Sequence, residues 1–128
     1  MEVMIALVII AILAALALPA YFRTVEQSRS NEAITNLNIV HMGEKIYRLN
    51  NNAFIIGGSV AALNTALNTD MSSTFYTGSV VAGATGIANS YVATFTRNNV
   101  SGGGGTKTFT YTFTNGDVAP VLTEGGAY

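Results

Sequence analysis

Residues 3–22, VMIALVIIAILAALALPAYF, form a run of twenty residues without a charge, between Glu2 and Arg23. At about 1.5 Å of rise per residue, a helix of this length spans about 30 Å, the thickness of a bilayer's hydrocarbon core. Eleven of the twenty are Val, Ile, Leu or Phe, and each of these stabilises an inserted helix by about 0.3 to 0.6 kcal/mol. A buried core helix is the alternative, but 128 residues are too few to enclose a helix that is apolar on every face. The run therefore predicts a helix that inserts into a membrane.

A cleaved secretory signal is a second alternative, because Ala15-Leu16-Ala17 resembles a small-residue cleavage site. Secretory signals begin with basic residues, whereas this chain begins Met1-Glu2. The helical pattern also continues past the point where a signal would end. We therefore expect the segment to remain part of the protein.

Residues 23–50 keep a helical pattern, but with apolar side chains on one face only. We predict one helix of about 48 residues, bent or locally melted near Pro19 and ended by Asn50-Asn51-Asn52. Glu44 and Arg48 have the i,i+4 spacing of a surface ion pair. The apolar half of the helix carries Val25, Ala33, Leu37, Ile39, Val40, Ile46 and Tyr47, and the polar half carries Gln27, Asn38, His41, Lys45 and Arg48.

The segment 51–128 has few charges and many Thr, Gly, Ser and Asn residues. A short helix is predicted from Ser59, with Ser59 as its N-cap. Apolar and threonine side chains then alternate in 91–96 and 108–114, which predicts two strands with an aromatic buried face. Weaker patterns predict strands at 74–82 and 118–122, a hairpin loop at 98–105 and a tight turn at Asn115-Gly116.

These patterns predict an α+β fold, in which one long N-terminal helix packs on a small antiparallel sheet. About 78 residues of sheet and loop would be marginally stable alone, so the amphipathic part of the helix is expected to complete the core. The chain then has three parts, a transmembrane half-helix at 1–22, an amphipathic half-helix at 23–50 and a head at 51–128. The expected head core contains Leu37, Val40, Tyr47, Phe95, Phe109, Tyr111 and Phe113.

Composition argues against several classes of function. The chain has no cysteine and a single histidine, so we expect neither an enzyme nor a cofactor. A net charge of −1 gives no signal for nucleic-acid binding. We interpret His41, on the polar side of the helix, as solvated or as capping a local group. Asp117 and Glu124 are weak candidates for calcium ligands, and a plain turn is the simpler interpretation.

The N-terminal segment MEVMIALVIIAILAALALPAYF resembles the type IV pilin family, which includes the pseudopilins of type II secretion. In that family a glutamate opens an apolar helix and a proline follows seventeen residues later, as Pro19 follows Glu2 here. The resemblance is strong over residues 1 to 25, looser over 26–56, and architectural beyond. It implies a subunit that is held in the cytoplasmic membrane, processed by a prepilin peptidase, and stacked by an assembly machinery into an extracellular homopolymer.

The resemblance also assigns roles to residues of the apolar N-terminal helix, called the rod below. It implies that Glu2 pairs with the N-terminal amine of an adjacent subunit; the simpler alternative places Glu2 among lipid headgroups, where it favours its own helix N-terminus. Pro19 and Ala11 would mark the region where family helices bend or melt, although Ala11 stands where many members have glycine. The stripe expected to pack in the filament core is Val3, Leu7, Ile10, Ala14 and Leu18.

Three functions remain open on the sequence. The first is the major subunit of a type IV pilus-like filament, whose role is left open among adhesion, twitching motility, DNA uptake, secretion and electron transfer. The second is the major pseudopilin of a type II secretion system. The third is a single-pass, membrane-anchored binding module that never polymerises. The family's basic leader and N-methylated first residue are absent from this sequence, so the resemblance implies a native chain that begins upstream of Met1.

Overall fold

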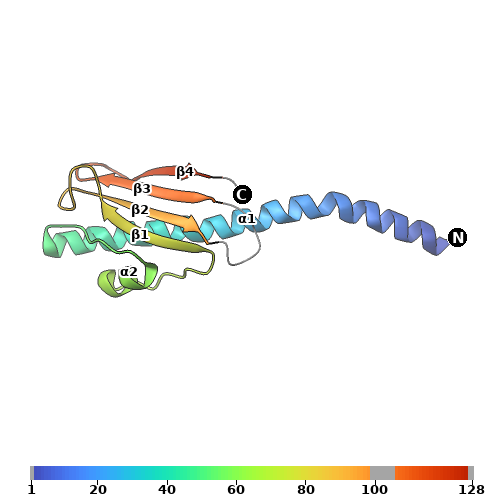
Figure 1. The fold of residues 1–128 in the computed structure, drawn as a ribbon, viewed down its shortest axis with the longest axis horizontal. Coiled ribbons are helices and arrows are strands. Elements are labelled where there is room, and N and C mark those ends of the chain that lie inside the picture. The colour runs from blue at the N-terminus through green and yellow to red at the C-terminus, as the bar shows by residue number, and fades with distance from the viewer. Residues whose placement is uncertain (1, 99–105, 127–128) are drawn as a thin grey trace. The chain divides into compact units, whose positions relative to one another are not determined.

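The computed structural model describes residues 2–98 and 106–126. Contacts divide the chain into two compact units, one ending at Ser30 and one beginning at Asn31. The fold class is α+β, as the sequence predicts. The elements, in chain order, are α1 (Glu2–Asn51), α2 (Val60–Leu67), β1 (Tyr76–Ala82), β2 (Ser90–Arg97), β3 (Thr108–Thr114) and β4 (Val121–Gly125) (Figure 1).

The first unit consists of the N-terminal part of α1, which continues without a break through Pro19. Proline has no N–H, so one carbonyl of the preceding turn loses its helical donor at this point. Beyond it, the Thr24 hydroxyl donates to the Ala20 carbonyl (3.1 Å), and Glu26 forms an ion pair with Arg29 (2.9 Å). The local melting expected near Pro19 is therefore not present in this structure.

The second unit is built on a four-stranded antiparallel sheet, in which each strand pairs with the next one in sequence. In the central pair, Phe95 lies opposite Phe109 on the buried face. Thr94 lies opposite Thr110 on the other face, where both are half-exposed. This alternation of aromatic and threonine side chains is the one that predicts β2 and β3 from the sequence.

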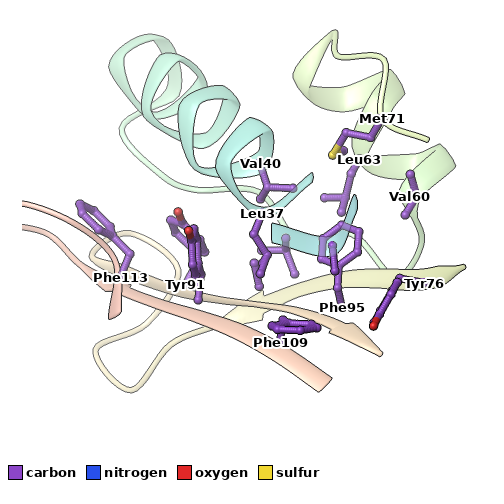
Figure 2. Close-up of a cluster of buried hydrophobic side chains, with 14 of the residues drawn as sticks. Leu37, Val40, Val60, Leu63, Met71, Tyr76, Tyr91, Phe95, Phe109 and Phe113 are labelled. Atoms are coloured by element: carbon purple, nitrogen blue, oxygen red, sulfur yellow. The ribbon is translucent and has the colours of Figure 1, made fainter. Parts of the chain in front are cut away.

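The core of the second unit lies between the sheet, residues 31–51 of α1, and α2. Figure 2 shows Leu37 and Val40 of α1 above the aromatic side chains of the sheet, with Leu63 of α2 beside them. Phe54 and Tyr91 meet edge to face, with ring centroids 5.0 Å apart. The buried hydrophobic residues are Ala33, Leu37, Val40, Phe54, Val60, Leu63, Met71, Tyr76, Val80, Tyr91, Ala93, Phe95, Phe109, Tyr111 and Phe113.

Local chemistry fixes the ends of α2 as the sequence predicts. The Ser59 hydroxyl accepts a hydrogen bond from the N–H of Ala62 (3.2 Å), which is the N-cap arrangement. The helix ends at Asn68, whose left-handed backbone (φ 52°) lets its N–H bond the Asn64 carbonyl. α2 is thereby held at both ends, and its Leu63 enters the core.

Several expectations for α1 are wrong or only partly met. Ile46 is 63% exposed, because it lies on the side of α1 away from the sheet. Tyr47 is half-buried and is not among the core residues, because it lies near the end of α1. The predicted surface pair of Glu44 with Arg48 does not form: Glu44 is fully buried, and Arg48 bonds Asn115 instead.

The strand limits differ slightly from the predicted ones. β1 begins at Tyr76 and not at residue 74, and β4 occupies Val121–Gly125 and not 118–122. The shift of β4 has a local cause, because Pro120 carries no N–H for the ladder and pairing starts after it. The predicted loop at 98–105 joins β2 to β3, but its residues 99–105 lie outside the described residues.

Candidate functional site

The apolar segment 3–22 is exposed along its whole length in the first unit. The exposed fraction of its large side chains is 73% at Val3 and still 53% at Leu18. Among the described residues, α1 is the helix long and apolar enough to cross a membrane, and none of its most apolar 18-residue window is buried. A core helix of a soluble protein would be mostly buried. By length and composition, this segment is suited to a membrane.

One side of this helix carries the stripe predicted to pack in a filament core. Its members are spaced three or four residues apart, which places them on one face of a helix. Every one is exposed in the structure, so no other part of the described chain covers the stripe. The stripe residues are Val3, Leu7, Ile10, Ala14 and Leu18, and the small residues along the helix that permit close approach of a neighbour are Ala6, Ala11, Ala14, Ala15 and Ala17.

Glu2 lies in the first turn of α1 and is exposed. A carboxylate at this end of a helix interacts favourably with the unpaired N–H groups there. In the described part of the chain Glu2 has no ion-pair or hydrogen-bond partner. Its carboxylate is therefore available to a cation on another molecule.

A second notable group, Glu44, lies inside the second unit, which is called the head from here on because it joins residues 31–51 of α1 to the predicted head. The sequence predicts it on the surface, but its side chain has no exposed area. The N–H of Ile55 donates to Oε2 (2.9 Å), whereas the buried Oε1 has no hydrogen-bond partner. Burial raises the pKa of the carboxyl group from 4.5 to about 7, and the Ile55 bond offsets part of this rise. Glu44 thus holds the segment after α1 against the helix. Above its raised pKa it also places a charge in the core, which destabilises the folded state.

Tyrosine hydroxyls extend this polar cluster from the sheet to α1. The Tyr91 hydroxyl lies 2.6 Å from Nδ1 of His41, and the Tyr111 hydroxyl donates to Oδ1 of Asn38 (2.9 Å). Burial and the neighbouring Glu44 raise the pKa of Tyr91. Burial also lowers the pKa of His41, with a smaller contribution from Lys45. His41 is therefore half-buried and joins the helix to the sheet, in place of the solvated or locally capping role that the sequence predicts.

The two weak calcium candidates serve separate local interactions. Asp117 accepts a hydrogen bond from the N–H of Thr114 through Oδ2 (2.9 Å), and Glu124 forms an ion pair with Lys107 (3.2 Å). Glu124 pairs in register with Phe109, so the two carboxylates lie at opposite ends of β3, a separation of roughly 17 Å. Within the described residues, no group of three His, Cys, Asp or Glu is placed to hold a metal.

Comparison of the chain with protein-family models, with curated proteins and with solved structures finds no match.

Proposed function

We propose that this chain is the structural subunit of a type IV pilus-like filament. Before assembly, residues 3–22 would hold the subunit in the cytoplasmic membrane; in the filament, the same residues would pack against those of other subunits. The observation that carries the proposal is that this twenty-residue apolar helix is exposed along its whole length, whereas the second unit buries a core of its own. A soluble monomer would leave that surface in water.

The physics of the segment suits a reversible transfer between two apolar surroundings. Lipid and a bundle of identical helices both exclude water from residues 3–22, so exchanging one for the other changes their hydration little. The alanines would let neighbouring helices approach closely enough for dispersion contacts to favour the bundle. Assembly and retrieval would then be nearly balanced, as a filament that grows from a membrane and returns to it requires.

Glu2 is the one group of the segment that opposes this transfer. A carboxylate moved out of water loses several kcal/mol of solvation unless a cation pairs with it. In the proposed filament the cation is the N-terminal amine of the next subunit. The charge at position 2 would therefore select the correct axial position of one helix against its neighbour.

Charge reversal at this position tests the proposal. Cells that produce the wild type should carry filaments that can be sheared off, imaged by electron microscopy and identified by mass spectrometry. Glu2→Lys should abolish them while leaving the protein in the membrane. Asp70→Lys is the matched control, because Asp70 is exposed in the head and the charge change is the same. Filaments of normal yield from Glu2→Lys would refute the pairing, and a wild type that stays monomeric in the membrane would favour an anchored binding module instead.

A type II secretion pseudopilin would share the same rod and the same assembly. Calcium would distinguish it, because the family resemblance implies that type II secretion pseudopilins are often calcium-dependent. Asp117 and Glu124 are engaged in separate interactions, so we expect the melting temperature of the head to be the same in calcium and in chelator. A clear rise with calcium would instead favour the pseudopilin.

A further inference from the structure

The head contains a groove of about 460 Å³ where α1 ends. This volume falls within the usual range of small-molecule sites. The last turns of α1 form one wall, the segment that follows α1 forms the floor, and the turn between β3 and β4 forms the other wall. The lining of the groove includes Lys45, Arg48, Asn52, Phe54, Asn115 and Asp117.

Two cations project over aromatic rings in this groove. Nζ of Lys45 lies 5.8 Å from the ring centroid of Phe113, and the Arg48 guanidinium lies 5.2 Å from that of Phe54. The guanidinium is held further by a hydrogen bond from Nη1 to Oδ1 of Asn115 (2.6 Å). Both charges are therefore positioned before any ligand arrives, which reduces the entropy lost on binding.

Lys107 differs from Lys45 and Arg48 in having a carboxylate partner. It lies over the Phe109 ring at 5.6 Å, in the same way that Lys45 lies over Phe113, but it also has the Glu124 carboxylate at 3.2 Å. Among the described residues, no carboxylate lies within ion-pair distance of Lys45 or Arg48. The Asp117 carboxylate on the opposite wall already accepts the Thr114 N–H. The groove therefore holds two cations without a carboxylate counterpart.

The rest of the lining favours a ligand rich in hydroxyl groups. The side-chain amides of Asn52 and Asn115 and the second oxygen of Asp117 are exposed and can donate to or accept from hydroxyls. The exposed side chain of Leu49, which also lines the groove, supplies an apolar surface for the C–H faces of a ring. A carboxylate on a ring with several hydroxyls combines all of these features.

We propose that this groove binds an acidic sugar, a hexuronic acid residue, with its carboxylate between Lys45 and Arg48. Its hydroxyls would lie against the exposed amides of the two walls. The proposal goes beyond filament assembly and does not depend on it, because the groove lies wholly within the second unit.

Binding of methyl glucuronide to the full-length protein in detergent micelles tests the inference, by titration calorimetry or ligand-observed NMR. Methyl glucoside is the matched neutral sugar, because it carries a hydroxymethyl group where the glucuronide carries its carboxylate, and acetate supplies a carboxylate without the sugar. Lys45→Gln should weaken glucuronide binding roughly tenfold, the loss expected for one hydrogen bond to a charged group. Lys107→Gln is the matched control, and it should leave binding unchanged because its charge lies at the other end of β3.

The expected order of affinity is glucuronide above both glucoside and acetate. Glucoside binding as tightly as glucuronide would overturn the role of the two cations, and acetate matching glucuronide would overturn the sugar. Equal loss in the two lysine variants would overturn the location, and no binding of glucuronide would overturn the site itself. Near-UV circular dichroism checks that Lys45→Gln is folded; the comparison of three ligands on the wild type needs no variant.

Discussion

Replacing Glu44 with glutamine should make the head more stable at alkaline pH and change little at acidic pH. The wild-type carboxyl has a pKa of about 7 in the folded head and an ordinary value of 4.5. Its folded state therefore binds a proton more tightly than its unfolded state. The stability that this proton contributes is complete below pH 4.5, and it is lost as the pH rises through 7.

The size of the effect follows from the shift. A change of one pKa unit corresponds to about 1.4 kcal/mol, so a shift from 4.5 to about 7 corresponds to about 3 kcal/mol. Glutamine resembles the protonated acid, because it keeps an oxygen for the Ile55 N–H and carries no charge. Relative to the wild type, Glu44→Gln should gain little at pH 5 and up to about 3 kcal/mol at pH 8.

The difference in stability between the two proteins is measured at each pH by urea unfolding in detergent micelles. Unfolding is followed by the near-UV circular dichroism of the buried tyrosines. His41, whose pKa is lowered, makes its own contribution with the opposite sign below pH 6.5. That contribution is common to both proteins and cancels in the difference. Asp70→Asn removes an exposed carboxylate and should leave the wild-type pH dependence intact. A Glu44→Gln effect that is the same at pH 5 and pH 8 would contradict the burial of this carboxyl group.

Two further substitutions test the packing of the head. Gly78→Ala would place a Cβ 2.4 Å from the Phe95 ring, so we expect the free energy of unfolding in urea to fall by about 1 to 3 kcal/mol. Gly58→Ala is the control, because its Cβ would meet nothing within 4 Å, and it should be far less destabilising. Equal losses of stability in the two variants would refute the contact with Phe95. Ser59→Ala removes the N-cap of α2 and should lower the free energy of unfolding by about 1 kcal/mol. Amide hydrogen exchange should become faster in the first turn of α2 only. Unchanged exchange in that turn would contradict the cap.

Elements whose signal is local could be predicted from the sequence. The twenty uncharged residues define the apolar helix, and the alternation of aromatic residues with threonine defines β2 and β3, because each pattern lies within one element. The N-cap at Ser59 depends on hydrogen bonds within one turn.

Features that depend on contacts distant in sequence could not be predicted in this way. The i,i+4 spacing of Glu44 and Arg48 predicts a surface pair, although Glu44 is seven residues from Leu37 and shares its side of α1. Its N–H donor comes from Ile55, and the partner of His41 is fifty residues away in β2. The groove likewise forms between α1 and the turn after β3, and the spacing of residues in the sequence does not show that these two segments lie close together.

The order β1-β2-β3-β4 has a consequence for how the head acquires its structure. Every ladder joins strands adjacent in sequence, so no segment of the sheet has to wait for a partner synthesised much later. Pairing between neighbouring strands favours rapid formation of the sheet, because little loop entropy is lost at each step. A chain whose N-terminal end is already fixed could therefore build this sheet one hairpin at a time, without threading its free end past the tethered one.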